Sequence, residues 1–185
     1  MRYKSLKKMN QKGQIVEILS SSSAYKVNEM IVLSKEKDYL SKSQKRQYSL
    51  FDGILVGEHQ GLGNFTLGQR KGINVGGKKK PLYVIGFDEQ EHRLFVGEGA
   101  THPGLYTKIL AFEKKSLLKV DFVKLEQDLL VEVKFEFEEK PISAKLLVFE
   151  NYIFLQFDDF IRAEMVNHKI SINYKNKMLF NINEN

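Results

Sequence analysis

This chain of 185 residues contains no cysteine, no tryptophan and only three prolines. Without cysteine it can form neither disulfides nor thiolate zinc sites, and it cannot carry thiolate or persulfide chemistry. No segment approaches the roughly 18 apolar residues of a membrane-spanning helix. The basic beginning is not followed by an apolar run, so the sequence predicts no signal peptide. These absences lead us to expect a cytoplasmic protein without a membrane partner.

The charge of the chain is concentrated near its beginning. The formal net charge is +6, and residues 1–50 hold 11 Lys and Arg against 4 Asp and Glu. A basic arm on nearly neutral domains favours attraction to nucleic acid, and the alternative is a solvated basic tail. A hydrophobic content of 42% is enough for a packed core in one or two domains.

Short apolar segments bounded by turn residues recur along the chain, which is typical of β-strands. Four strands are predicted before Pro103, at residues 13–19, 53–57, 81–88 and 92–96. Six more are predicted after it, at residues 107–112, 129–137, 142–149, 152–157, 169–174 and 178–182. Asp158 and Asp159 are expected to end a strand as a turn. Short strands at this spacing suggest a small barrel in the second half.

One segment shows the clearest alternation of the chain. Its two predicted faces are Val131, Val133, Phe135 and Phe137 on one side, and Glu132, Lys134, Glu136 and Glu138 on the other. We therefore expect an all-β protein, with a small central β domain followed by a six-stranded β-barrel. The expected divisions are a basic arm at 1–12, a central domain at 13–104 with an insertion at about 20–50, and the barrel at 105–185. Residues 24–48 could form a short helix, a hairpin or an ordered insertion.

Residues 57–72 hold five glycines, a Gln-Arg-Lys cluster and one histidine. Glycine at this density indicates tight turns or close backbone approach, and the adjacent amide and cations suit a polyanion. The stretch is not a phosphate-binding loop of the Walker type, because no Lys-Ser/Thr pair follows its glycines. The four histidines lack the spacing of a zinc helix, so we expect no metal site and no cofactor.

The same stretch resembles the G-E-H-x-G-L…T-x-G-Q-R-K-G segment of bacterial tRNA-specific 2-thiouridylases, which sulfurate the wobble uridine of certain tRNAs. The likeness continues on both sides, in Lys12–Val16, Gly76–Gly77, Pro81–Ile85, Arg93–Gly97 and Thr101–Leu105. It implies the central and C-terminal β domains of that family, including a barrel similar to those of translation elongation factors. The family's ATP-binding domain, with its S-G-G-V-D-S loop and two catalytic cysteines, has no counterpart in these 185 residues.

The resemblance implies a non-catalytic tRNA-binding portion that positions tRNA, with no role for DNA. A catalytic thiouridylase domain or a sulfur-relay protein would be a further partner, because the chain is not expected to be an enzyme on its own. The candidate RNA-binding residues are His59, Gln69, Arg70, Lys71, Lys78, Lys79 and Lys80. Arginine offers phosphate a rigid fork of donors and lysine a point charge. The alternative is that Gln69 and Arg70 hold the glycine loop together, and that Lys78 to Lys80 are only solvated.

The second half of the chain departs from the family pattern. Glu136, Glu138 and Glu139 stand where the family carries a basic strand, and carboxylates there would repel RNA. The T-P-G-Q turn and the closing G-G-G of the family are also replaced. A second interpretation is therefore a decayed paralogue or a protein-interaction module that kept the barrel and lost RNA binding.

Overall fold

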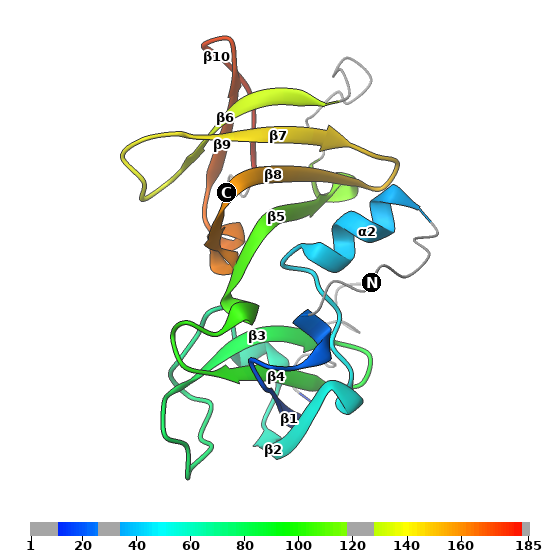
Figure 1. The fold of residues 1–185 in the computed structure, drawn as a ribbon, viewed down its shortest axis with the longest axis vertical. Helices are drawn as coiled ribbons and strands as arrows, with labels where there is room; N and C mark the ends of the chain where they lie inside the picture. The colour runs from blue at the N-terminus through cyan, green and yellow to red at the C-terminus, as the bar shows by residue number, and fades with distance from the viewer. Residues whose placement is uncertain (1–10, 26–33, 118–127, 183–185) are drawn as a thin grey trace. The chain divides into compact units, whose positions relative to one another are not determined.

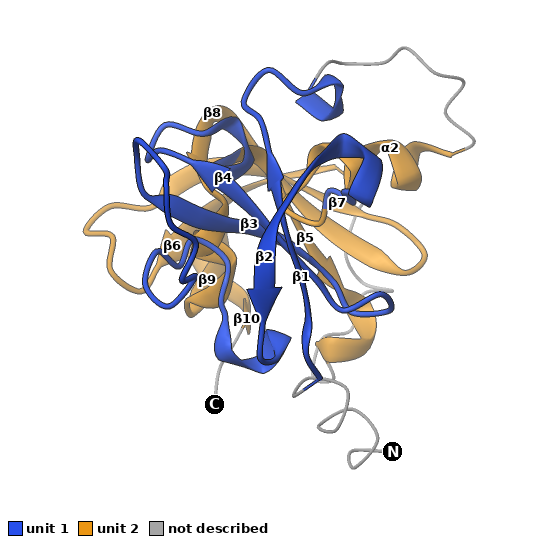
Figure 2. Ribbon diagram, turned by 90° about the horizontal axis from the view of Figure 1, so that it is seen from below, with its two compact units in different colours: residues 1–30, 46–106 blue, residues 31–45, 107–185 orange. Residues whose placement is uncertain are grey.

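The computed structural model describes residues 11–25, 34–117 and 128–182. The chain divides into two compact units. Unit 1 comprises residues 1–30 and 46–106, and unit 2 comprises residues 31–45 and 107–185 (Figure 2). Most of the predicted basic arm, residues 1–10, lies outside the described residues. Within the described ranges, no helix is both long and apolar enough to cross a membrane.

Unit 1 contains a four-stranded sheet in the order β2-β1-β4-β3 (Figure 1). Its strands are β1 (Gly13–Ile18), β2 (Gly53–His59), β3 (Leu82–Asp88) and β4 (Arg93–Glu98). β1 runs parallel to β4 and antiparallel to β2, and β3 and β4 pair as an antiparallel hairpin. All four strands fall where the sequence predicts them.

Both faces of this sheet are covered over β1, β4 and most of β3, which explains why these three strands read as nearly continuous apolar runs. On one face Ile15 packs in a cluster with Leu62 and Ile73, which come from the long connection between β2 and β3. On the other face Val16 packs in a cluster with Tyr48. The connection that carries the candidate residues is therefore attached to the core through its own apolar side chains.

Unit 2 contains a six-stranded sheet in the order β10-β9-β6-β7-β8-β5. Its strands are β5 (Tyr106–Glu113), β6 (Leu129–Phe135), β7 (Ile142–Val148), β8 (Tyr152–Arg162), β9 (Ile170–Tyr174) and β10 (Lys177–Ile182). The all-β class and the number of strands in this half are confirmed. In the described residues β10 and β5 are the two end strands of this order, and no pairing between them closes the sheet into a barrel.

Two local predictions in unit 2 are wrong. β6 buries Val131, Val133 and Phe135 as expected, but it ends at Phe135, and Phe137 is 75% exposed in the following turn. Asp158 and Asp159 do not end a strand, because β8 continues through them to Arg162. In both cases the alternation of apolar and polar residues does not predict the residue at which the strand ends.

The segment that the sequence left open contains a helix, α2 (Lys35–Lys42), which belongs to unit 2. Ser34 caps its first turn by accepting a hydrogen bond from the Lys37 amide. Tyr39 packs against Phe154, with ring centroids 5.3 Å apart. Glu36 accepts hydrogen bonds from the backbone amides of Asn151 and Tyr152, where β8 begins. The helix is therefore fixed by packing and capping together.

Candidate nucleic-acid interface

The connection between β2 and β3 is tied to the sheet of unit 1 by backbone hydrogen bonds. The Gly68 amide donates to the Val84 carbonyl, and the Val84 amide donates to the Gln69 carbonyl, each at 2.9 Å. Gly68 and Gly72 both have positive φ, at 82° and 85°, a conformation that side chains rarely adopt. The glycines at these positions thus let the chain turn twice around the Gln-Arg-Lys cluster.

The side chain of Gln69 bridges the two ends of this turn. Its Oε1 accepts hydrogen bonds from the Thr66 amide at 2.9 Å and from the Thr66 hydroxyl at 3.2 Å. Its Nε2 donates to the Lys71 carbonyl at 2.8 Å and to the Asn64 carbonyl at 3.3 Å. Both polar atoms of the amide are engaged within the loop. Gln69 therefore holds the glycine loop together, which is the alternative role that the sequence left open for it.

Arg70 and Lys71 project from the turn that Gln69 holds. Both are exposed. Within the described ranges, no carboxylate forms an ion pair with either of them. Gln69 fixes the backbone carbonyl of Lys71 by a hydrogen bond, and Arg70 lies between these two residues. Two adjacent cations on a fixed backbone make a surface that can contact phosphate.

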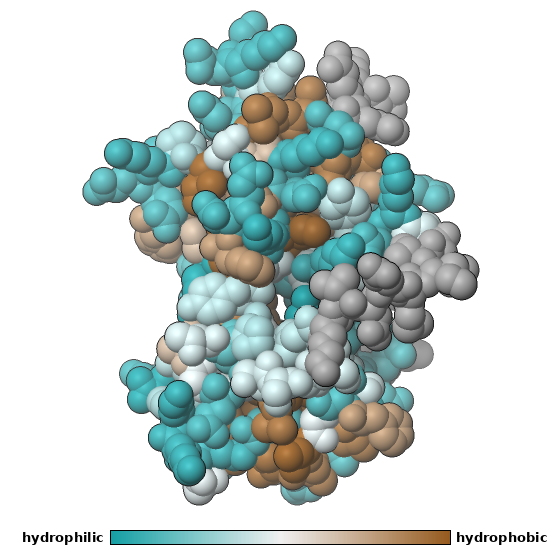
Figure 3. Space-filling view, in the orientation of Figure 1, coloured by the Kyte–Doolittle hydropathy of each residue, from teal (hydrophilic) through white to brown (hydrophobic). Residues whose placement is uncertain are grey.

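The three lysines before β3, Lys78 to Lys80, have different surroundings. Lys78 forms an ion pair with Glu17 of β1, whose side chain is only 4% exposed. Lys79 and Lys80 are exposed, and the Lys80 amide donates to the Glu98 carboxylate at 3.0 Å. On the face shown in Figure 3, the lower left of the molecule, over this connection, is hydrophilic. Lys79 and Lys80 thus remain available to a phosphate, whereas Lys78 is turned toward a buried carboxylate.

His59 is buried at the end of β2, with 3% of its surface exposed. Its Nδ1 accepts a hydrogen bond from the Gly61 amide at 3.0 Å, so Nε2 carries the proton and donates to the His92 carbonyl at 3.0 Å. Burial lowers the pKa of His59, which keeps the ring neutral. The structure places His59 beneath the loop and apart from the exposed cations.

His102 is bound in the same way, although sequence reasoning gave it no role. Its Nδ1 accepts from the Gly104 amide at 3.2 Å, and its Nε2 donates to the Ile18 carbonyl at 2.9 Å. Burial lowers the pKa of His102 as well. In the sequence both histidines precede a glycine by two residues, which is the only local sign of this arrangement.

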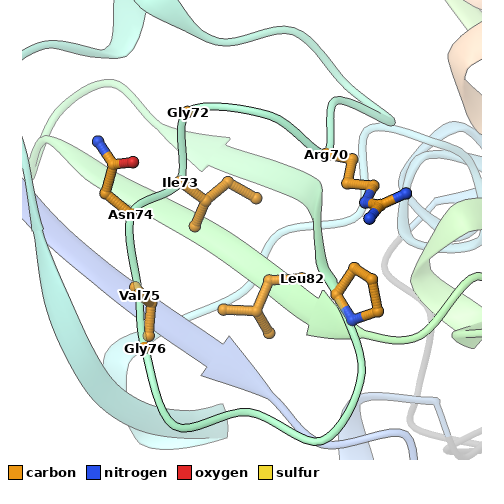
Figure 4. Close-up of a pocket in the computed structure, with 8 residues that line it drawn as sticks. Arg70, Gly72, Ile73, Asn74, Val75, Gly76 and Leu82 are labelled. Atoms are coloured by element: carbon orange, nitrogen blue, oxygen red, sulfur yellow. The ribbon is translucent and has the colours of Figure 1, made fainter.

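A pocket of about 400 Å³ lies inside the curve of the connection (Figure 4). Ile73 and Leu82 point into the space that the loop encloses, while Arg70 lies on one side of it, and Pro81 also lines the pocket. Of the sequence-predicted residues only Arg70 lines this pocket. The remaining residues that line the pocket could not be predicted from sequence, because the pocket forms only when residues 70–76 fold against the beginning of β3.

Comparisons with known proteins match this part of the chain. A family model described as the PRC-barrel domain of tRNA methyl transferases matches residues 37–98, which include the whole connection between β2 and β3. The chain is 34% identical over 147 residues to the tRNA-specific 2-thiouridylase MnmA of Karelsulcia muelleri, covering 80% of this chain and 36% of that protein.

Two further relatives carry the same name. The protein of Flavobacterium johnsoniae is 35% identical over 150 residues, covering 80% of this chain and 38% of the relative. The protein of Pseudoalteromonas translucida is 38% identical over 124 residues, covering 63% of this chain and 33% of the relative. The chain thus spans somewhat more than a third of the length of the relatives that match 80% of it.

Proposed function

We propose that this chain, which resembles the central and C-terminal β domains of the tRNA-specific 2-thiouridylases, holds tRNA in position for thiolation of its wobble uridine. The observation that carries this proposal is the pair Arg70 and Lys71, exposed on a turn that Gln69 fixes from within. Because the backbone of the turn is already ordered, little conformational entropy is lost when phosphate binds. Lys79 and Lys80 extend the same basic surface.

The proposed role is to bind and orient, and the chemistry of sulfur transfer lies elsewhere. The 185 residues contain no cysteine, so the thiol groups for sulfur transfer would come from another polypeptide segment. We further propose that an ATP-dependent catalytic thiouridylase domain supplies them, with a sulfur-relay protein as its source of sulfur. We propose accordingly that the chain acts in the cytoplasm, where tRNA and such partners meet.

Unit 2 is not proposed as the main RNA surface. Glu136, Glu138 and Glu139 are exposed in the turn after β6, beside the exposed ring of Phe137. Carboxylates in this position would repel phosphate, as the sequence comparison with the family pattern already suggests.

A protein-interaction module is the second candidate function, and one specific observation favours it. β2 is an edge strand of the unit 1 sheet, and it carries Ile54 and Leu55, each 54% exposed. Phe51, just before β2, is 97% exposed. Exposed apolar side chains on a sheet edge are typical of a surface that another polypeptide covers.

The experiment that tests the main proposal is binding of the full chain to total tRNA over a range of salt concentrations. We expect the wild type to bind with a clear salt slope, and Arg70→Ala/Lys71→Ala to bind more weakly. Its slope should fall by roughly 0.7 to 0.9 for each phosphate contact that is lost. The matched control is Lys134→Ala/Lys177→Ala, which removes two exposed cations from unit 2 and should retain the wild-type slope.

The contrary result is equally clear. If the folded wild type does not bind tRNA even at low salt, the RNA-binding proposal is lost. The protein-interaction module then becomes the better proposal, and the exposed β2 edge is the surface to examine.

A further inference from the structure

The lining of the pocket beside Arg70 is partly apolar and partly polar. Ile73 and Leu82 are 5% and 6% exposed, and their side chains point into the space that the loop encloses (Figure 4). Pro81, which is exposed, also lines the pocket. A flat apolar group could lie against these three side chains without leaving a buried polar atom unpaired.

One cation, Arg70, lines the same pocket, and three lysines lie elsewhere in the same connection. The loop that encloses it begins at Arg70 and Lys71 and returns through Lys79 and Lys80 before it reaches Pro81. In the part of the chain that the structure describes, none of these four cations forms an ion pair with a carboxylate. A pocket with an apolar part and an exposed arginine in its wall suits a ligand that has both a flat apolar face and an anionic group.

A nucleotide combines these two properties, since its base has a flat face and its phosphate is an anion that the arginine fork can bind. In a double helix the base faces are stacked inside and cannot enter a protein pocket, whereas an unpaired base can turn outward. A volume of about 400 Å³ falls in the range of small-molecule pockets.

We propose that this pocket takes one unpaired nucleotide of the bound RNA, with its base against Ile73, Leu82 and Pro81 and its phosphate on Arg70. The inference rests on the proposed function, because it assumes that the loop meets RNA. It adds that the surface distinguishes single-stranded from paired segments, which phosphate contacts alone do not do. In a tRNA such nucleotides lie in the loops.

The test compares binding of the full chain to a tRNA anticodon stem–loop and to a blunt RNA duplex with the same number of phosphates. We expect the wild type to bind the stem–loop about five-fold more tightly, since removing part of one base from water against apolar side chains contributes about this much. Gly76→Phe adds bulk at the pocket wall, where a Cβ would meet nothing within 4 Å. This variant should lose the preference for the stem–loop while its affinity for the duplex is unchanged.

A matched pair of substitutions guards against an effect of folding. Pro81 and Pro141 are both exposed, and each immediately precedes a strand, β3 and β7 respectively. Pro81→Ala should weaken binding of the stem–loop more than binding of the duplex, whereas Pro141→Ala in unit 2 should change neither.

Three results would overturn the proposal. If the wild type binds stem–loop and duplex equally, the pocket takes no base, although phosphate binding by the loop still stands. If folded Gly76→Phe and Pro81→Ala both keep the preference, the preference arises elsewhere. If neither RNA binds at low salt, the pocket proposal fails together with the tRNA-binding function.

Discussion

Lys78 and Glu17 form an ion pair in unit 1, although they lie 61 positions apart in the sequence. The side chain of Glu17 is 4% exposed and that of Lys78 is 25% exposed. The lysine thus closes over a carboxylate at the sheet and attaches the loop before β3 to β1. This contact separates Lys78 from its two neighbours, which remain exposed.

Replacing Lys78 should therefore reduce stability more than it reduces RNA binding. Lys78→Ala leaves the Glu17 carboxylate buried without its partner, which we expect to lower the free energy of unfolding by about 1–3 kcal/mol. Urea denaturation measures this loss. Lys79→Ala is the matched control and should change stability by less than about 0.5 kcal/mol. A Lys78→Ala variant as stable as Lys79→Ala would show that the ion pair has little structural importance.

The stability of unit 1 should decrease when the pH falls below about 6.5, the ordinary pKa of histidine. Burial lowers the pKa of His59 and of His102, so at mildly acidic pH the unfolded chain binds protons that the folded chain does not. The neutral rings contribute full stability above that pH, and each can account for a loss of at most about 1.4 kcal/mol per pH unit below it.

Urea denaturation at pH 7.5 and at pH 5.5 measures this loss for the wild type. His59→Gln should show a smaller dependence, since it lacks one of the two groups. An equal stability of the wild type at both pH values would contradict the account of the two histidines.

The sequence was sufficient to predict where the strands lie, because their apolar segments are short and bounded by turn residues, but it misplaced the ends of β6 and β8. It could not assign roles to the candidate residues. His59 lies in the same glycine-rich stretch as Arg70, yet one is buried and the other exposed. The sequence does not show that Lys78 differs from Lys79, since Glu17 comes near Lys78 only when β1 joins the folded sheet. The resemblance to the thiouridylases pointed to this segment as a candidate surface, but it could not tell which of its side chains are exposed and which are buried or paired.

Gln69 should act as a positioning residue for RNA binding. Gln69→Ala removes four hydrogen bonds that hold the turn, so Arg70 and Lys71 would have to be ordered when RNA binds. We expect tRNA affinity to fall about five- to ten-fold, with an unchanged salt slope because both cations remain. Gln90→Ala, at an exposed glutamine of the β3–β4 turn, is the control. A reduced slope for Gln69→Ala would instead mean that binding by the cations themselves is lost.

The packing of His102 against Gly97 gives a prediction on stability that is independent of RNA. A Cβ at Gly97 would fall on the His102 ring, closer than real Cβ atoms approach other atoms. In Gly97→Ala the ring must shift, which strains its hydrogen bonds to the Ile18 carbonyl and the Gly104 amide. We expect a loss of about 1–3 kcal/mol in the free energy of unfolding, measured by urea denaturation.

Gly76→Ala provides the matched control for this change. A Cβ at Gly76 meets nothing within 4 Å, so the same substitution there should leave stability within about 0.5 kcal/mol of the wild type. Because both variants add one methyl group to a glycine of unit 1, their difference isolates the contact with the His102 ring. If the two variants were equally stable, the ring would not be held by its two hydrogen bonds, and the acid sensitivity expected of unit 1 would have to come from His59 alone.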